Sequence, residues 1–196
     1  MVKRCKLYLL SAAAVILFSA CAGDVNEGSS SSQEITDILP SESEESPVSD
    51  SVQVVFEAQD IEGNTVSSAI FSDSKLTMIN VWATYCNPCL KEMPGLGELA
   101  SEYDAETFQL IGIISDVQEG AGQELMDLAA GLIEQTGADY THLLLNESLY
   151  YSMLEDVTAV PTTFFVDENG VILGAVVGSM EKSSWEELIN ALLEEQ

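Results

Sequence analysis

The chain has 196 residues, enough for one domain with its own hydrophobic core plus extensions and too few for two large domains. It carries 33 acidic residues against six basic ones, a formal net charge of −27. Because a nucleic acid would be repelled from nearly every face of such a protein, nucleic-acid binding is excluded. An acidic surface suits basic partners, and it suits plain solubility in a salty exterior equally well.

Residues 1–20 have the pattern of a lipoprotein signal peptide. Basic residues at the start are followed by an apolar run that is too short for a comfortable membrane span. The segment Phe18-Ser19-Ala20-Cys21 resembles a bacterial lipobox, which implies cleavage before Cys21 and lipidation of its thiol. An uncleaved membrane anchor is the alternative, and in both cases the domain that follows lies outside the cytoplasm.

The composition changes to Ser, Glu, Asp and Pro over residues 21–51. Such a segment has too little apolar surface to offset its ordering entropy, so we expect a disordered acidic tether. A flexible chain of about 30 residues reaches on the order of 30 Å, and self-repelling charge extends it further. The tether would hold the folded domain, expected over 52–196, clear of the lipid.

The folded part opens with two strand-like runs, 52–58 and 65–71, on either side of a Gly63-Asn64 turn. This arrangement predicts an N-terminal β-hairpin. The apolar run over 76–81 then predicts a buried strand.

Two cysteines, Cys86 and Cys89, lie where this strand gives way to a helical pattern. Pro88 suits the first turn of a helix, where its missing N–H has no intrahelical partner, and this places Cys86 at or just before the helix N-terminus. The free backbone N–H groups and the positive end of the helix dipole favour a thiolate there. The pair can therefore cycle between dithiol and disulfide, with Cys86 attacking and Cys89 resolving.

Other uses of Cys86 and Cys89 fit the sequence less well. A purely structural disulfide would close so short a loop that it removes little entropy from the unfolded chain. A zinc site needs two further ligands, and the chain offers one histidine, His142, so we expect no metal. Covalent haem attachment needs a histidine after the second cysteine, where Leu90 stands.

The rest of the chain alternates helices and strands. Its patterns predict, in order, a helix over 87–103 kinked at Pro94, a buried parallel strand over 108–114, a helix containing 125–133, a strand over 142–145, a short helix over 148–156, strands over 162–166 and 171–177, and a last helix. The turn at 167–170 predicts an antiparallel hairpin, and Ser184 with Glu187 predicts a capping box on the last helix. The result is a sheet with helices on both faces.

Several of these residues together resemble the thioredoxin superfamily: Trp82, the Cys86/Cys89 pair, Pro94 and Val160-Pro161-Thr162. The string Cys-x-x-Cys-Leu-Lys-Glu-Met-Pro on a lipoprotein is similar to the TlpA/ResA branch of membrane-anchored thiol-disulfide oxidoreductases. The resemblance covers roughly residues 52–196. It implies an α/β thioredoxin fold, with a central mixed β-sheet flanked by helices, an N-terminal β-hairpin, and an insertion between the CxxC helix and a cis-proline.

The resemblance also changes how Pro161 is interpreted. An X-Pro bond is trans by default, but thioredoxin-like proteins carry a cis-proline beside the two sulfurs. The backbone of Val160 would then pair with the substrate polypeptide as an added strand. Tyr85 departs from the family, in which most members have tryptophan at this partner-contact position. The residues expected to bind substrate are Trp82, Tyr85, Asn87, Pro88, Val160 and Thr162.

Two further candidates are Glu92, which has two possible roles, and Trp82. Glu92 is either a solvated first-turn glutamate that complements the helix dipole or, as the resemblance implies, a partly desolvated carboxylate with a raised pKa. In the second case it would join Cys86, Cys89 and Pro161 as a catalytic residue that handles protons for the thiols. Trp82 is expected chiefly to pack below the disulfide.

We therefore expect a monomeric, extracytoplasmic thiol-disulfide oxidoreductase, anchored to the membrane by lipid at Cys21 and without a bound cofactor, that reduces disulfides of secreted or membrane-associated proteins. The resemblance implies re-reduction by a membrane electron donor of the CcdA or DsbD type. It also implies substrates such as apocytochrome c or oxidised methionine sulfoxide reductases.

Three other functions are alternatives to this one. A disulfide-donating oxidase uses the same chemistry. The reduction potentials of a reductase such as thioredoxin and an oxidase such as DsbA differ by an equivalent of roughly 7 kcal/mol. The identity of the two residues between the cysteines, Asn87 and Pro88, does not tell which end of that range applies. A copper or haem chaperone is disfavoured because no further histidine or methionine motif lies near the cysteines. A peroxiredoxin relies on an arginine beside its reactive cysteine, and the chain after residue 20 has no arginine.

Overall fold

The computed structural model describes residues 53–195. The signal peptide expected over 1–20, the lipidation of Cys21 and the tether expected over 21–51 lie outside this range and remain predictions. Within residues 53–195, no helix is long and apolar enough to span a bilayer.

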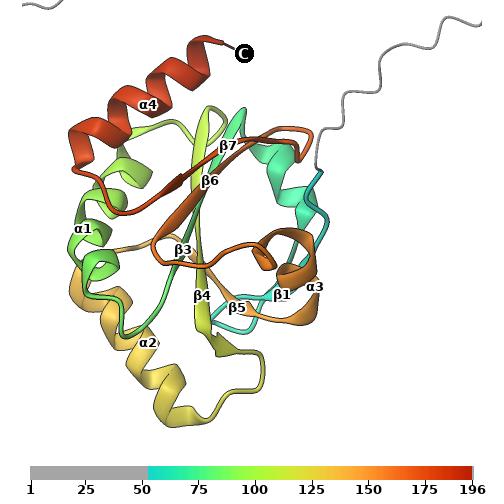
Figure 1. The fold of residues 1–196 in the computed structure, drawn as a ribbon, viewed down its shortest axis with the longest axis vertical. Helices are drawn as coiled ribbons and strands as arrows, with labels where there is room; N and C mark the ends of the chain where they lie inside the picture. Colours follow the sequence, from blue (N-terminus) through green and yellow to red (C-terminus); the bar gives the residue numbers. More distant parts are fainter. Residues whose placement is uncertain (1–52, 196) are drawn as a thin grey trace, which may run out of the picture. The chain divides into compact units, whose positions relative to one another are not determined.

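A five-stranded mixed sheet organises the domain (Figure 1). Its strands are β3 (Leu76–Trp82), β4 (Phe108–Gln118), β5 (Thr141–Leu145), β6 (Thr162–Asp167) and β7 (Ile172–Val177). Their order in the sheet is β5-β4-β3-β6-β7. The β3/β4 and β4/β5 pairs are parallel, and the β3/β6 and β6/β7 pairs are antiparallel. The expected hairpin around residues 167–170 is therefore the β6/β7 pair.

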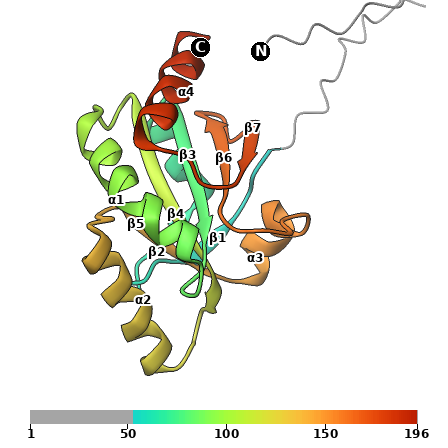
Figure 2. The same ribbon diagram turned by 60° about the vertical axis from the view of Figure 1, so that its left-hand side comes forward.

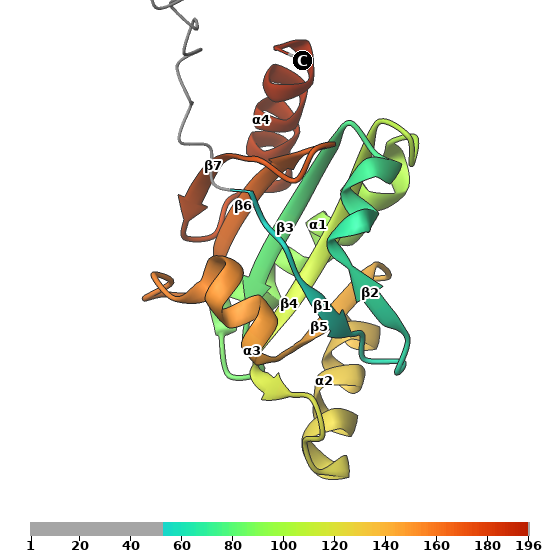
Figure 3. The same ribbon diagram turned by 90° about the vertical axis from the view of Figure 1, so that its right-hand side faces the viewer.

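Helices cover both faces of this sheet, which confirms the predicted α/β thioredoxin architecture. They are η1 (Ser68–Asp73, a 3₁₀-helix), α1 (Asn87–Glu102), α2 (Gln123–Thr136), α3 (Glu147–Leu149), η2 (Tyr150–Leu154, a π-helical turn) and α4 (Lys182–Glu194). Figure 2 shows α1, α2 and α4 along one face. Figure 3 shows the other face, covered by η1, α3 and the antiparallel pair of β1 (Glu57–Gln59) and β2 (Thr65–Ser67).

The central strand β3 is buried along its whole length, as its unbroken apolar run predicts. Successive side chains of a strand point to opposite faces, so β3 contributes to the core on both sides. Ile79 and Val81 pack with the hairpin and α3, whereas Met78 packs with α1 and α4. Trp82 ends the strand in a separate cluster that contains both cysteines. The most buried strand therefore leads directly to the CxxC turn.

The predicted capping box of the last helix is wrong. Helix α4 begins at Lys182 with Glu181 as its N-cap, and no side chain caps it. The backbone N–H of Ser184 already donates to the carbonyl of Glu181 over 2.9 Å, so Ser184 lies inside the first turn. Trp185 in the same turn is buried against Phe165 of the sheet.

The N-terminal hairpin is present but shorter than predicted. β1 and β2 pair over three residues each, and the chain after Ser67 turns into η1 instead of extending to residue 71. The Ser67 hydroxyl accepts from the backbone N–H of Ala69 and so caps this helix. The helical turn places Phe71 in the core beside Phe56. Packing of one aromatic side chain thus overrides the strand pattern.

Candidate active site

The two cysteines lie at the start of α1, directly after β3. Cys86 is the N-cap residue, Pro88 lies in the first helical positions, and Cys86 Sγ accepts a hydrogen bond from the backbone N–H of Cys89 over 3.3 Å. The sulfurs form a disulfide across a Cα–Cα distance of 5.3 Å. A helix N-terminus favours negative charge, so this position stabilises a Cys86 thiolate once the bond is reduced.

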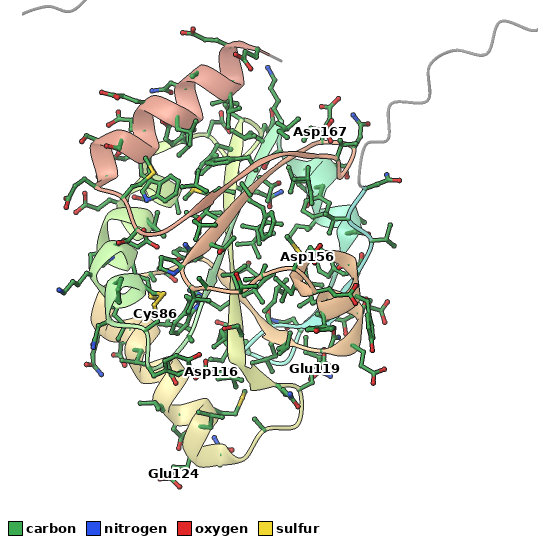
Figure 4. All side chains as sticks on the ribbon, viewed as in Figure 1. Cys86, Asp116, Glu119, Glu124, Asp156 and Asp167 are labelled. Carbon is green, nitrogen blue, oxygen red and sulfur yellow. A yellow bond between two sulfur atoms is a disulfide. The ribbon has the colours of Figure 1, made fainter. Side chains whose placement is uncertain are left out.

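The two sulfurs differ in access. Cys86 is 5% exposed, whereas Cys89 is fully buried one helical turn further on. An incoming disulfide can therefore reach Cys86 and not Cys89. Figure 4 shows Cys86 at the end of α1 that faces the carboxyl ends of the parallel strands.

A second loop completes the site. The Val160–Pro161 peptide bond is cis, as the resemblance implied. Pro161 is buried and leads into β6, next to β3, while Val160 is half-buried and packs against the cluster that contains both cysteines. This loop and the CxxC turn therefore form adjacent parts of one surface.

An acidic residue that the sequence analysis did not single out fixes the turn before Cys86. Asp116 accepts from the Thr84 backbone N–H over 3.0 Å and from the Thr84 hydroxyl over 2.5 Å. It lies on β4, which is longer than predicted and extends to Gln118. The sequence did contain a signal for Asp116, namely a polar residue that follows a buried parallel strand. The carboxyl ends of such strands lie together at the edge of an open sheet where functional sites form.

The structure corrects the solvated interpretation of Glu92. Its side chain is 7% exposed and accepts three hydrogen bonds: from Asn80 Nδ2 (3.1 Å), the Met180 backbone N–H (3.1 Å) and Trp185 Nε1 (3.4 Å). Burial raises the pKa of Glu92 above its ordinary value, although these donors oppose the rise. Glu92 and Cys89 are three residues apart, so both project from one face of α1 into the interior.

Two buried polar atoms beside Glu92 have no hydrogen-bond partner among the described residues: Asn80 Oδ1 and Tyr140 Oη. Asn80 uses its amide nitrogen to donate to both Glu92 and Thr163 Oγ1. Burial, and next the Glu92 carboxylate, raise the pKa of Tyr140. Sequence reasoning missed both residues, although a lone asparagine inside the apolar run of β3 does signal a buried polar contact.

Trp82 is fully buried, which corrects its place among the residues expected to touch substrate. Its indole N–H donates to His142 Nδ1 over 3.1 Å, and His142 Nε2 lies 3.0 Å from the carbonyl of Ala138. The carbonyl requires a donor, so Nε2 carries the proton and His142 is neutral. Burial lowers the pKa of His142 to about 4. His142 is thus a buried residue whose two ring nitrogens both have hydrogen-bond partners.

The other residues expected to bind substrate divide by exposure. Tyr85 is 74% exposed, and Asn87 and Pro88 are exposed beside it. Thr162 is 4% exposed and its hydroxyl donates to the Ala159 carbonyl, so its side chain shapes the cis-proline loop and offers little contact surface. The accessible surface next to Cys86 therefore consists of Tyr85, Asn87, Pro88 and the half-buried Val160.

Known proteins are similar to this chain in sequence. Residues 52–175 match the model of the AhpC/TSA family. The ResA thiol-disulfide oxidoreductase of Halalkalibacterium halodurans is 25% identical over 139 residues, which are 71% of this chain and 74% of that protein. The thiol:disulfide interchange protein DsbE of Vibrio cholerae is 32% identical over 133 residues, 67% of this chain and 65% of that protein.

A solved structure agrees on the fold. A thioredoxin-family thiol:disulfide interchange protein of Chlorobium tepidum superposes with a TM-score of 0.62 at 22% identity, covering 73% of this chain and 96% of its own. The chain pairs this fold with a CxxC disulfide at a helix N-terminus and a cis-proline. It belongs to the thioredoxin-like AhpC/TSA family and is a thiol-disulfide oxidoreductase.

Proposed function

We propose that the protein works as a reductase on disulfide-bonded proteins outside the cytoplasm. The observation that carries this proposal is the Cys86–Cys89 disulfide at the N-terminus of α1, with the attacking sulfur reachable and the resolving sulfur buried. In this arrangement a bound partner is attacked once and then released, because the second thiol lies within bonding distance of the first.

The reaction starts from the reduced enzyme. The Cys86 thiolate attacks one sulfur of the substrate disulfide, the other substrate sulfur leaves as a thiolate, and a mixed disulfide forms. Cys89 then loses its proton and attacks Cys86 Sγ, which releases the second substrate sulfur. The substrate gains two electrons from the two thiols, one proton that comes from Cys89 and one from solvent, and the enzyme ends as the Cys86–Cys89 disulfide.

Glu92 supports the second step in this proposal. Cys89 is fully buried, so its proton needs an acceptor within the protein. Glu92 is the buried carboxylate on the same face of α1, and its raised pKa brings it closer to that of a thiol than an ordinary glutamate would be. Proton transfer from Cys89 to Glu92 would prepare the resolving thiolate.

The remaining parts of the proposal concern the setting. The lipobox-like Cys21 would hold a monomer at the outer face of the membrane, and a membrane electron donor of the CcdA or DsbD type would return the disulfide to the dithiol. The similarity to a ResA oxidoreductase and a DsbE interchange protein supports this placement. Cell fractionation tests the anchor: Cys21→Ser should move the protein out of the membrane fraction, and retention there would contradict lipid attachment.

Direction can be tested by running the exchange both ways. The pre-reduced protein should reduce a disulfide-bonded protein faster than the oxidised protein forms disulfides in a reduced, unfolded one. The Cys86→Ser variant should be inactive in both assays. Faster oxidation than reduction would instead identify a disulfide-donating oxidase.

A further inference from the structure

A hollow of about 240 Å³ opens beside the disulfide. Its rim includes Tyr85, directly before Cys86, and Val160, directly before the cis-proline, so it lies between the two chain segments that border the reacting sulfur. Its far wall is formed by Tyr150 and Leu154 of η2, with Leu145 from the end of β5. We call it the Tyr85 hollow.

The Tyr85 hollow has the size and lining of a receptor for one side chain. It is smaller than the roughly 300–1,000 Å³ of typical small-molecule sites. Valine, leucine, alanine and tyrosine side chains make up most of its wall. Tyr85 and Tyr150 are 74% and 41% exposed, and exposed aromatic side chains are the typical anchors of protein interfaces.

Two further hollows flank the first one and share its residues. One continues past Val157 to Glu155 and Asp156 along β6 and β7, and the other continues past Leu145 to Glu119 and Glu147. Every charged residue that lines the three hollows is acidic.

We call the three hollows together the groove. No basic side chain of the described residues lines the groove to offset these acids. Among residues 53–195 the lysines are Lys75, Lys91 and Lys182, none of which lines the hollows. Lys182 lies on α4, where it pairs with Glu98 (2.9 Å) and Glu102 (2.6 Å). A positively charged segment is therefore attracted to both flanking hollows, which also share Tyr151 with each other, and an acidic segment is repelled.

We propose that the three hollows select the substrate of the redox site: an extended, basic segment of a disulfide-bonded polypeptide. A large apolar side chain one or two residues from the reacting cysteine enters the Tyr85 hollow, since an extended chain advances about 3.3 Å per residue. Lysine or arginine residues beyond it lie against Glu155 and Asp156 on one side and Glu119 and Glu147 on the other. This inference rests on the proposed function.

The test uses the reduced protein and disulfide-linked peptide pairs that differ only beside the cysteine. One series carries lysine or glutamate flanks, and the other carries leucine or alanine next to the cysteine. Each second-order rate is divided by the rate of the same protein with 2-hydroxyethyl disulfide, a small neutral substrate. We expect lysine flanks to react about tenfold faster than glutamate flanks at low salt, with the ratio shrinking at high salt.

Variants assign these preferences to the groove. Glu155→Gln with Asp156→Asn should reduce the lysine preference at least about threefold, whereas Glu187→Gln with Glu194→Gln, the same charge change on α4, should leave it intact. Tyr150→Ala should reduce the leucine preference, and Leu173→Ala, at a similarly exposed site on β7, should not.

Each outcome decides one of the two proposals. Equal rates for all peptides, or equal effects of groove and control variants, would overturn the groove inference while reduction of 2-hydroxyethyl disulfide keeps the proposed function. Failure to reduce any disulfide, the small one included, would overturn the proposed function and the groove inference with it.

Discussion

The indole N–H of Trp82 donates to Nδ1 of His142 across 3.1 Å, directly beneath the redox pair. The bond joins the last residue of β3 to β5, and it requires an unprotonated Nδ1. Protonation of His142 would place two donors against each other in the core. The floor of the active site therefore depends on a neutral histidine.

Acid should weaken the domain through His142. Its folded pKa of about 4 lies below the ordinary 6.5, so the unfolded chain binds the proton more tightly. The stabilisation is complete above pH 6.5 and is lost as the pH falls through about 4, by at most about 3 kcal/mol. Urea unfolding measured across this pH range should show that the free energy of unfolding falls more steeply with acid in the wild type than in His142→Gln. Parallel pH dependences of the two proteins would contradict this prediction.

Glu92 should act in the opposite direction. Its raised pKa means that the folded state holds the proton more tightly, so its stabilising effect is present below pH 4.5 and is lost as the pH rises through the raised pKa. Relative to Glu92→Gln, the wild type should lose unfolding free energy as the pH rises through that window, because only the protonated carboxyl is favoured by the folded state. The exposed Glu106→Gln serves as control, and a pH-independent difference for Glu92→Gln would contradict the prediction.

Asn80 explains how the site holds Glu92 in both protonation states. Its amide nitrogen donates to the ionised carboxylate, and its Oδ1 has no hydrogen-bond partner among residues 53–195. Rotation of the amide would present Oδ1 as the acceptor for protonated Glu92. Asn80→Leu should therefore shift the pH dependence of the rate at which Cys89 resolves a mixed disulfide on Cys86. An unchanged pH profile would show that Asn80 has only a packing role.

Gly112 leaves the space that His142 occupies. A Cβ at this position would lie 2.2 Å from His142 Nδ1, the atom that accepts from Trp82. Gly112→Ala should destabilise the domain by about 1–3 kcal/mol through overpacking. The matched change at Gly174, where a Cβ meets nothing within 4 Å, should cost less. Equal midpoints of thermal unfolding for the two variants would contradict this placement.

Removal of the resolving thiol should trap partners. With Cys89→Ser the mixed disulfide on Cys86 has no second sulfur to release it, so disulfide-linked adducts should accumulate in cells and disappear on reduction. The double variant with Cys86→Ser should form none. If Cys89→Ser recovers no more adducts than the double variant, the two-step exchange is wrong.

The strands and the redox turn could be predicted because their signals are local. The apolar run of β3 and the placement of Pro88 locate Cys86 at the start of α1 without any tertiary information. The cis geometry of Pro161 depended on the family resemblance, since the residues alone favour trans.

The environment of Glu92 could not be predicted in the same way. Two of its donors, Met180 and Trp185, are 88 and 93 residues away along the chain and reach it only through the packing of α4 on α1. A surface-like position in a first helical turn thus becomes a buried one. The Tyr85 hollow has the same origin, because η2 lies beside Tyr85 only in the folded chain.

The reduction potential of the Cys86/Cys89 couple tests the central claim most directly. The purified protein would be equilibrated in redox buffers, and mass spectrometry would count the alkylated cysteines. A reductase should have a value near that of thioredoxin, about −270 mV. A value near that of DsbA, about −120 mV, would contradict the reductase and identify a disulfide donor.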